Sequence, residues 1–116
     1  MSNRAWDPKA DVLQGTLDLM VLQTLDSLGP RHGYAIAARL EQVSSGALQL
    51  NMGTLYPALM RLEQRGVLGG KRGTTETNRK ARFYSVTSAG RRQLARETDA
   101  WNRMSGIIHT VLHGEA

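Results

Sequence analysis

With 116 residues, of which 41% are hydrophobic, the chain has room for one domain built around one core. It contains no cysteine, which excludes disulfide bridges and thiolate metal or redox sites. The sequence shows no signal-peptide pattern and no run of roughly 20 apolar residues, so we expect a cytoplasmic protein without a membrane span.

The positive charge is concentrated in one segment. The formal net charge is +5, and residues 61–96 alone hold ten basic and two acidic side chains, while the flanking segments are slightly acidic. A basic chain can favour nucleic acid, an anionic membrane or simple solubility. Here the excess positive charge is confined to less than a third of the chain, which favours a surface that binds nucleic acid.

Two amphipathic helices are predicted in the first half of the chain. Apolar residues at three- and four-residue steps predict the first helix over residues 12–28, where Gly29 and Pro30 end it. The same spacing predicts a second helix over residues 34–43. Alternation at residues 48–50 permits a short strand.

A third helix is predicted by the segment NMGTLYPALMRLEQRG, whose leucines share one face. Asn51 can cap it, but Pro57 deletes one backbone hydrogen bond if the helix starts that early. With Thr54 as the cap, Pro57 falls in the first turn, where its missing N–H has no partner to lose. We therefore expect irregular backbone at residues 51–54 and regular helix over 55–65.

A basic β-hairpin is expected next. Strands are predicted over residues 67–72 and 79–87, joined by the polar segment GTTETN at residues 73–78. Its basic side chains fit contacts with phosphates or a minor groove, most of all Arg79, Lys80 and Arg82. The alternative is a solvated charged loop.

A last helix is predicted from Thr87 or Ser88 to about His113. A helix at the chain end has little of its own domain to cover an apolar stripe, so a partner subunit is expected to bury it. The alternative is burial against the helix over residues 12–28. The stripe comprises Leu94, Thr98, Trp101, Met104 or Ser105, Ile108, and Val111 or Leu112.

This order of elements predicts a mainly α fold with a small β-hairpin. The predicted fold is a winged helix-turn-helix followed by a long C-terminal dimerisation helix. We expect an N-terminal arm at residues 1–11, a DNA-binding domain at 12–87 and the dimerisation helix at 88–116.

The third helix is the candidate recognition helix. With its leucines inward, the residues predicted to face outward are Gly53, Pro57, Arg61 and Gln64, with Thr54 and Tyr56 on the flanks. Small residues, including Ala58, would allow close approach to DNA, and the longer side chains could reach bases or phosphates. So sparse a face predicts modest or indirect specificity. The alternatives are packing for Tyr56 and solvation for Arg61.

Four motifs give the chain a resemblance to a known family. It resembles the PadR family of bacterial transcriptional regulators from Leu13 to Leu112. The resemblance implies winged-helix homodimers that mostly repress transcription and release DNA on binding small molecules or on other signals. It also implies that Tyr34, Thr54, Tyr56, Pro57 and the hairpin lie at the DNA surface. The single last helix is similar to the short subfamily. The motifs are LQGTLDLMVLQTL, HGYAIAARLE, GTLYPALMRLEQRGVL and RFYSVTSAGRRQL.

An effector site is implied by the same resemblance. Trp101 is similar in position to a tryptophan that lines a hydrophobic pore between subunits in multidrug-responsive members. A planar aromatic or cationic effector would then stack on paired Trp101 rings, beside Met104 and Ile108. The alternative is ordinary interface packing of Trp101. Trp6 could join this site if the N-terminal arm folds over the dimer.

Catalysis and metal binding are not expected. No nucleophile, base and orienting group occur together, so we expect neither an enzyme nor a cofactor. His109 and His113 share a helix face, but two ligands are weak evidence for a metal site. The sequence predicts a homodimeric repressor that binds double-stranded DNA. The rivals are a winged helix for protein contacts and a non-specific or RNA-binding module.

Overall fold

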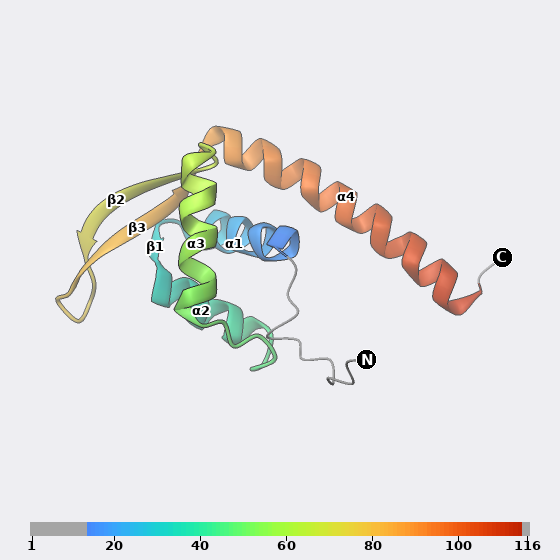
Figure 1. Cartoon of the computed structure of the whole chain (residues 1–116), viewed down its shortest axis with the longest axis horizontal. Helices are drawn as coiled ribbons and strands as arrows, with labels where there is room; N and C mark the ends of the chain where they lie inside the picture. Colours follow the sequence, from blue (N-terminus) through green and yellow to red (C-terminus); the bar gives the residue numbers. More distant parts are fainter. Residues whose placement is uncertain (1–13, 115–116) are drawn as a thin grey trace, which may run out of the picture.

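A winged helix with a long projecting helix is the architecture of the computed structural model, which describes residues 14–114 (Figure 1). The fold is mainly helical, as predicted, and carries a three-stranded antiparallel sheet in the order β1-β3-β2. Residues 1–13, which include Trp6 and the expected arm at 1–11, lie outside the described part. The elements are α1 (Gln14–Leu28), β1 (Arg31–His32), α2 (Gly33–Val43), α3 (Met52–Gln64), β2 (Leu68–Thr74), β3 (Lys80–Val86) and α4 (Ser88–His113).

The predicted hairpin forms the wing. Its register runs from Leu68 opposite Val86 to Thr74 opposite Lys80, and the tip closes where the Thr75 N–H donates to the Arg79 carbonyl at 2.8 Å. The two strands therefore lie close to their predicted positions on either side of the polar turn.

The third strand, β1, was not predicted. Arg31 pairs with Tyr84 and His32 with Phe83, which adds β1 to the free edge of β3. The expected strand at residues 48–50 is wrong, since that segment is irregular. A strand of two residues carries no alternation, so its pairing depends on how α1 and α2 are placed.

The hydrophobic core lies between α1, α2, α3 and the sheet. Each helix contributes one apolar face, because apolar side chains on one face leave water together, although Val43 at the end of α2 is 65% exposed. α4 contributes Leu94. The core residues are Leu17, Val21, Leu22, Leu25, Ile36, Leu40, Leu55, Ala58, Leu59, Leu62, Val67, Leu68, Tyr84, Val86 and Leu94.

α3 begins earlier than predicted. The side chain of Asn51 accepts a hydrogen bond from the Thr54 N–H at 2.9 Å, which makes Asn51 the cap, and the helix is regular from Met52. The expected cap at Thr54 is wrong, and Pro57 lies inside the helix. The bond lost at Pro57 is outweighed because the leucines of α3 anchor it in the core.

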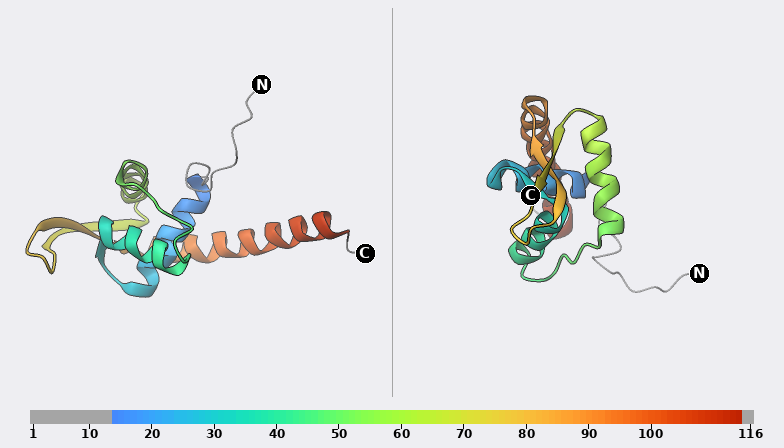
Figure 2. Two further views of the ribbon diagram at one scale, coloured as in Figure 1. Left: turned by 90° about the horizontal axis from the view of Figure 1, so that it is seen from below. Right: turned by 90° about the vertical axis from the view of Figure 1, so that its left-hand side faces the viewer.

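α4 leaves the body of the domain after its first two turns. Thr87 caps it, as one of the two predicted caps, by accepting from the Gly90 N–H at 3.0 Å. Gly90 and Leu94 are its buried residues, and every residue from Thr98 to Gly114 is exposed. The helix therefore projects away from the end that carries the wing, giving a molecule of 54 × 34 × 26 Å (Figure 2).

None of the helices in the described part of the chain has the length and apolar character needed to cross a membrane.

Candidate nucleic-acid interface

A cleft of about 720 Å³ separates the wing tip from the first turns of α2 and α3. Four of the eight predicted DNA-contacting residues meet there, namely Tyr34, Tyr56, Arg79 and Lys80. They come from three elements that lie far apart in sequence. The remaining lining residues are His32, Thr75, Glu76, Thr77 and Ala81.

Close packing of α2 against α3 brings the two tyrosines to this cleft. A Cβ added at Gly33 would lie 2.8 Å from the Met52 Cε and 3.2 Å from the ring of Tyr56, so a glycine permits this approach. Tyr34 is 66% exposed and Tyr56 is 40% exposed. Both rings are therefore accessible to a partner, and Tyr56 is not ordinary core packing.

His32 connects the cleft to the wing. Its Nδ1 accepts a hydrogen bond from the Ala35 N–H at 3.4 Å, which caps α2, and its ring contacts Phe83 edge-on with centroids 5.4 Å apart. Its Nε2 lies 3.7 Å from a carboxylate oxygen of Glu76 at the wing tip. His32 was not among the residues predicted to contact DNA, but the structure places it in the lining of the cleft.

The exposed face of α3 differs from the predicted one. Gly53, Thr54, Pro57 and Gln64 are exposed as expected, but Ala58 is fully buried and gives no close approach to DNA. Sequence reasoning missed Met60, which is 56% exposed. If Ala58 is included with the leucines that face the core, the predicted exposed face of α3 turns towards Met60. The sequence alone therefore contained the information needed to find Met60.

Arg61 does not face outward, which corrects the prediction. Its Nη2 donates to the Oδ1 of Asp18 at 3.0 Å, and Asp18 of α1 is 4% exposed. A buried carboxylate needs a cationic partner, so Arg61 is held towards the core. Burial raises the pKa of Asp18, although Arg61 and Arg65 act against it.

Arg82 is also engaged within the chain. Its guanidinium donates from Nε to the Oε1 of Glu63 at 3.1 Å, and from Nη2 to Oε2. The hydrogen bond from Arg82, followed by its charge, lowers the pKa of Glu63. The side chain of Arg82 is 44% exposed, but the carboxylate of Glu63 neutralises its charge.

The other cations of the wing are exposed, and they are Lys71, Arg72, Arg79 and Lys80. Lys71 and Arg72 line a second hollow of about 320 Å³ together with Pro30 and Phe83. Hollows lined by cations therefore occur along the wing as well as at its tip.

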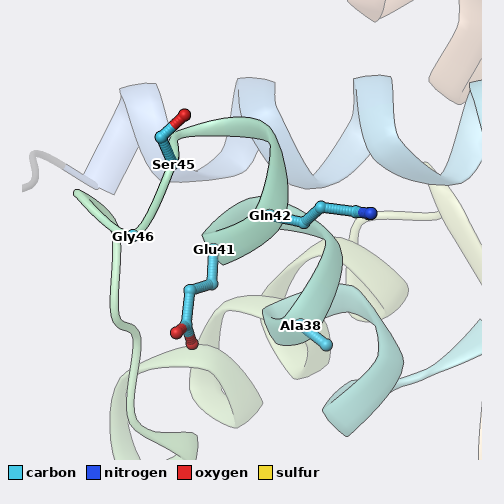
Figure 3. A pocket seen from close by; sticks show the side chains of 5 residues that line it. All are labelled: Ala38, Glu41, Gln42, Ser45 and Gly46. Atoms are coloured by element: carbon cyan, nitrogen blue, oxygen red, sulfur yellow. The ribbon is translucent and has the colours of Figure 1, made fainter.

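A hollow of about 500 Å³ at the end of α2 is unlike the cleft (Figure 3). The side chains of Glu41, Gln42 and Ser45 point in different directions, and no basic side chain lines it. It offers neither converging groups nor positive charge.

The predicted effector residues lie on the projecting part of α4. Trp101, Met104 and Ile108 are 49%, 52% and 46% exposed, so α1 does not cover them, contrary to the alternative of burial within the chain. The rings of His109 and His113 lie 4.4 Å apart, yet no group of three metal-ligating side chains occurs within residues 14–114.

The chain is similar in sequence and fold to known proteins. The model of the "Transcriptional regulator PadR-like family" matches residues 21–96. A transcriptional regulator of Clostridium thermocellum is similar with a TM-score of 0.77 and 26% identity, over 86% of this chain and 96% of that one. A PadR family transcriptional regulator of Eggerthella lenta is similar with a TM-score of 0.75 and 26% identity, over 88% and 86% of the two chains.

A similarity in sequence covers the same region. The chain is 45% identical over 80 residues to a protein of Streptomyces fradiae named "Uncharacterized 37.1 kDa protein in transposon TN4556". The match spans 69% of this chain and 21% of that protein.

Proposed function

Because the chain belongs to the Transcriptional regulator PadR-like family, we propose that it binds double-stranded DNA as a homodimer and represses transcription. The proposal rests mainly on the cleft beside the exposed face of α3. Four of the predicted contact residues converge there, namely Tyr34, Tyr56, Arg79 and Lys80. Two cations and two accessible aromatic hydroxyls from three elements suit a phosphate backbone bordering a groove.

The two parts of this surface have different roles. α3 enters the major groove with the exposed residues from its N-terminal end to just past its middle. These residues are Gly53, Thr54, Tyr56, Pro57 and Met60. The wing places its cations on the adjacent phosphates, which supplies affinity without reading sequence. Because α3 presents few hydrogen-bonding side chains, sequence preference depends partly on DNA shape.

α4 supports the homodimer. Six large apolar side chains on its projecting part are between 46% and 74% exposed, namely Trp101, Met104, Ile107, Ile108, Val111 and Leu112. A second copy of α4 would cover such a stripe, and two recognition helices would then reach half-sites about 34 Å apart.

An effector is the finer part of the proposal. A planar aromatic molecule would bind between the two subunits against Trp101, Met104 and Ile108. It shifts the dimer between geometries only if it binds them with different affinity. Titration of a Trp6→Phe variant with planar aromatic compounds isolates the Trp101 fluorescence. Unchanged fluorescence together with unchanged DNA release would reduce Trp101 to interface packing.

The direct test is duplex binding as a function of salt. Changing both Arg79 and Lys80 to Ala should weaken binding and flatten the log–log salt slope by about two units. A variant with Arg96 and Arg103 of α4 changed to Ala loses the same charge away from the cleft and serves as the matched control. Equal affinity of the two variants would remove the cleft from the mechanism. Salt-independent, negligible duplex binding by the unmodified protein would favour a protein-contact module.

A further inference from the structure

A polar cluster with one buried carboxylate at its centre joins α1, the C-terminal end of α3 and α4. Asp18 of α1 is 4% exposed, accepts a hydrogen bond from Arg61 at 3.0 Å, and has its Oδ2 3.9 Å from the Nη1 of Arg65. Arg61 and Arg65 are four residues apart on α3, so they reach Asp18 from one face of the helix.

The cluster continues into α4. The Nη2 of Arg65 donates to the Oε1 of Gln93 at 3.4 Å, and the Nε2 of Gln93 donates to the Oε2 of Glu97 at 2.7 Å. The negative charge of Glu97 also acts on Asp18. The hydrogen bond from Arg65 to Gln93 therefore connects the Asp18 cluster to α4, and Glu97 joins the cluster from within α4 itself.

The first two turns of α4 also hold it to the body, by packing against α1 and β3. Its buried residues are Gly90 and Leu94, and Arg91 lies 3.4 Å from a carboxylate oxygen of Asp26. Leu94 lies between Gln93 and Glu97, so the cluster holds the helix beside its last buried residue. The remaining helix, from Leu94 to His113, is roughly 28 Å long at 1.5 Å per residue. A tilt of about 10° at Leu94 would move its far end by about 5 Å.

The cluster is costly as a device for stability alone. Asp18 is withdrawn from water and Arg61 is partly withdrawn, at a cost that packed apolar side chains would not incur. Within the described residues, the Nε of Arg61 is a buried polar atom without a hydrogen-bond partner. A buried polar group can instead fix one geometry, as a single buried asparagine fixes the register of a coiled coil.

We propose that Asp18, Arg65, Gln93 and Glu97 are positioning residues that set the angle between α4 and the recognition helix. The angle itself is a property of one chain. Its effect on DNA binding rests on the proposed function, because α4 fixes the separation of the two reading heads only in a dimer.

The angle can be measured directly, because the absence of cysteine allows spin labels at introduced sites. We would place cysteines at the exposed positions Gln42 and Arg103, and dilute the doubly labelled chain with excess unlabelled chain. Double electron–electron resonance then reports the distance between α2 and α4 within one subunit, whether or not the protein binds DNA.

The informative variants are Glu97→Gln and Asp18→Asn. Glu97→Gln alters a partly exposed side chain and should leave folding intact, whereas Asp18→Asn probes the buried centre. Each should shift the distance by several ångströms or broaden its distribution. Asp99→Asn, which removes an acidic charge from an exposed position of α4, should leave the distribution unchanged. Unchanged distances in Glu97→Gln and Asp18→Asn, both folded, would overturn the proposal.

Duplex affinity gives the second readout. Glu97→Gln should change it by about fivefold or more through the altered head separation, and Asp99→Asn by far less. A shift in distance without DNA binding by any variant would leave the positioning role standing and refute the proposed function. If all variants bind DNA and their distances are unchanged, the proposed function stands and the positioning role is refuted.

Discussion

Arg82 lies directly opposite Arg72 across the wing, and Glu63 of α3 takes up the guanidinium of Arg82. Like charges in a directly opposed cross-strand pair repel each other. Glu63 relieves this repulsion and at the same time ties the wing to the recognition helix. The same ion pair neutralises one of the wing's cations while leaving its side chain partly exposed.

Glu63→Gln should therefore strengthen duplex binding. The substitution removes a negative charge close to the phosphates and releases Arg82 to contact them. We expect higher affinity and a log–log salt slope steeper by about one unit. Arg82→Ala should weaken binding less than Arg79→Ala, since Arg79 is exposed in the cleft. A larger loss for Arg82→Ala would mean that Arg82 leaves Glu63 when DNA binds.

The stability of the protein should depend on pH through the same pair. Because the pKa of Glu63 in the folded chain is lowered from 4.5, its ionised form favours folding. That contribution is present above pH 4.5 and disappears as the pH falls through the lowered pKa. The melting temperature of the wild type should exceed that of Glu63→Gln near pH 7, and the gap should close as the pH falls through the lowered pKa of Glu63. A gap that widens towards acid would contradict the pairing.

Gly90→Ala should destabilise the protein strongly. A Cβ at this position would overlap the carbonyl oxygen of Val67, so α4 would have to move away from the start of β2. We expect a loss of about 2 kcal/mol or more in the free energy of unfolding. Gly106→Ala, on the same helix with open space around it, should instead gain about 0.5–1 kcal/mol. Chemical denaturation of both variants measures the difference, and equal effects would rule out the close approach at Gly90.

Ile108→Asp should separate the subunits. A charge in the middle of the exposed stripe of α4 would be buried without a partner in the proposed dimer. Thr110→Asp places the same charge on the opposite side of the helix and is the control. Analytical ultracentrifugation should find a monomer for the first variant and a dimer for the second. A dimer for both would show that the stripe is not the interface.

Local signals made the wing and α4 predictable. The polar turn between two short strands and the threonine that caps α4 act within a few residues, so the sequence alone reveals them. Family resemblance singled out Tyr34 and Tyr56, and the charge pattern singled out Arg79 and Lys80, but their meeting in one cleft is seen only in the structure.

Long-range partners could not be predicted. Arg61 meets Asp18 across 43 positions of sequence, and no periodic pattern marks such a pair. The cap of α3 was misjudged for a different reason. One hydrogen bond lost at Pro57 weighed against an early start, whereas the burial of the α3 leucines easily outweighs it.

The shortness of β1 determines where the wing can bend. β1 pairs with β3 only as far as Phe83, so the base of the wing is a three-stranded sheet tied through His32 to the first turn of α2. Beyond Arg82 the wing is a two-stranded ribbon. A ribbon of two strands twists more readily than a wider sheet. The tip can thus follow the local width of a DNA groove while the base keeps Tyr34 aligned with α3.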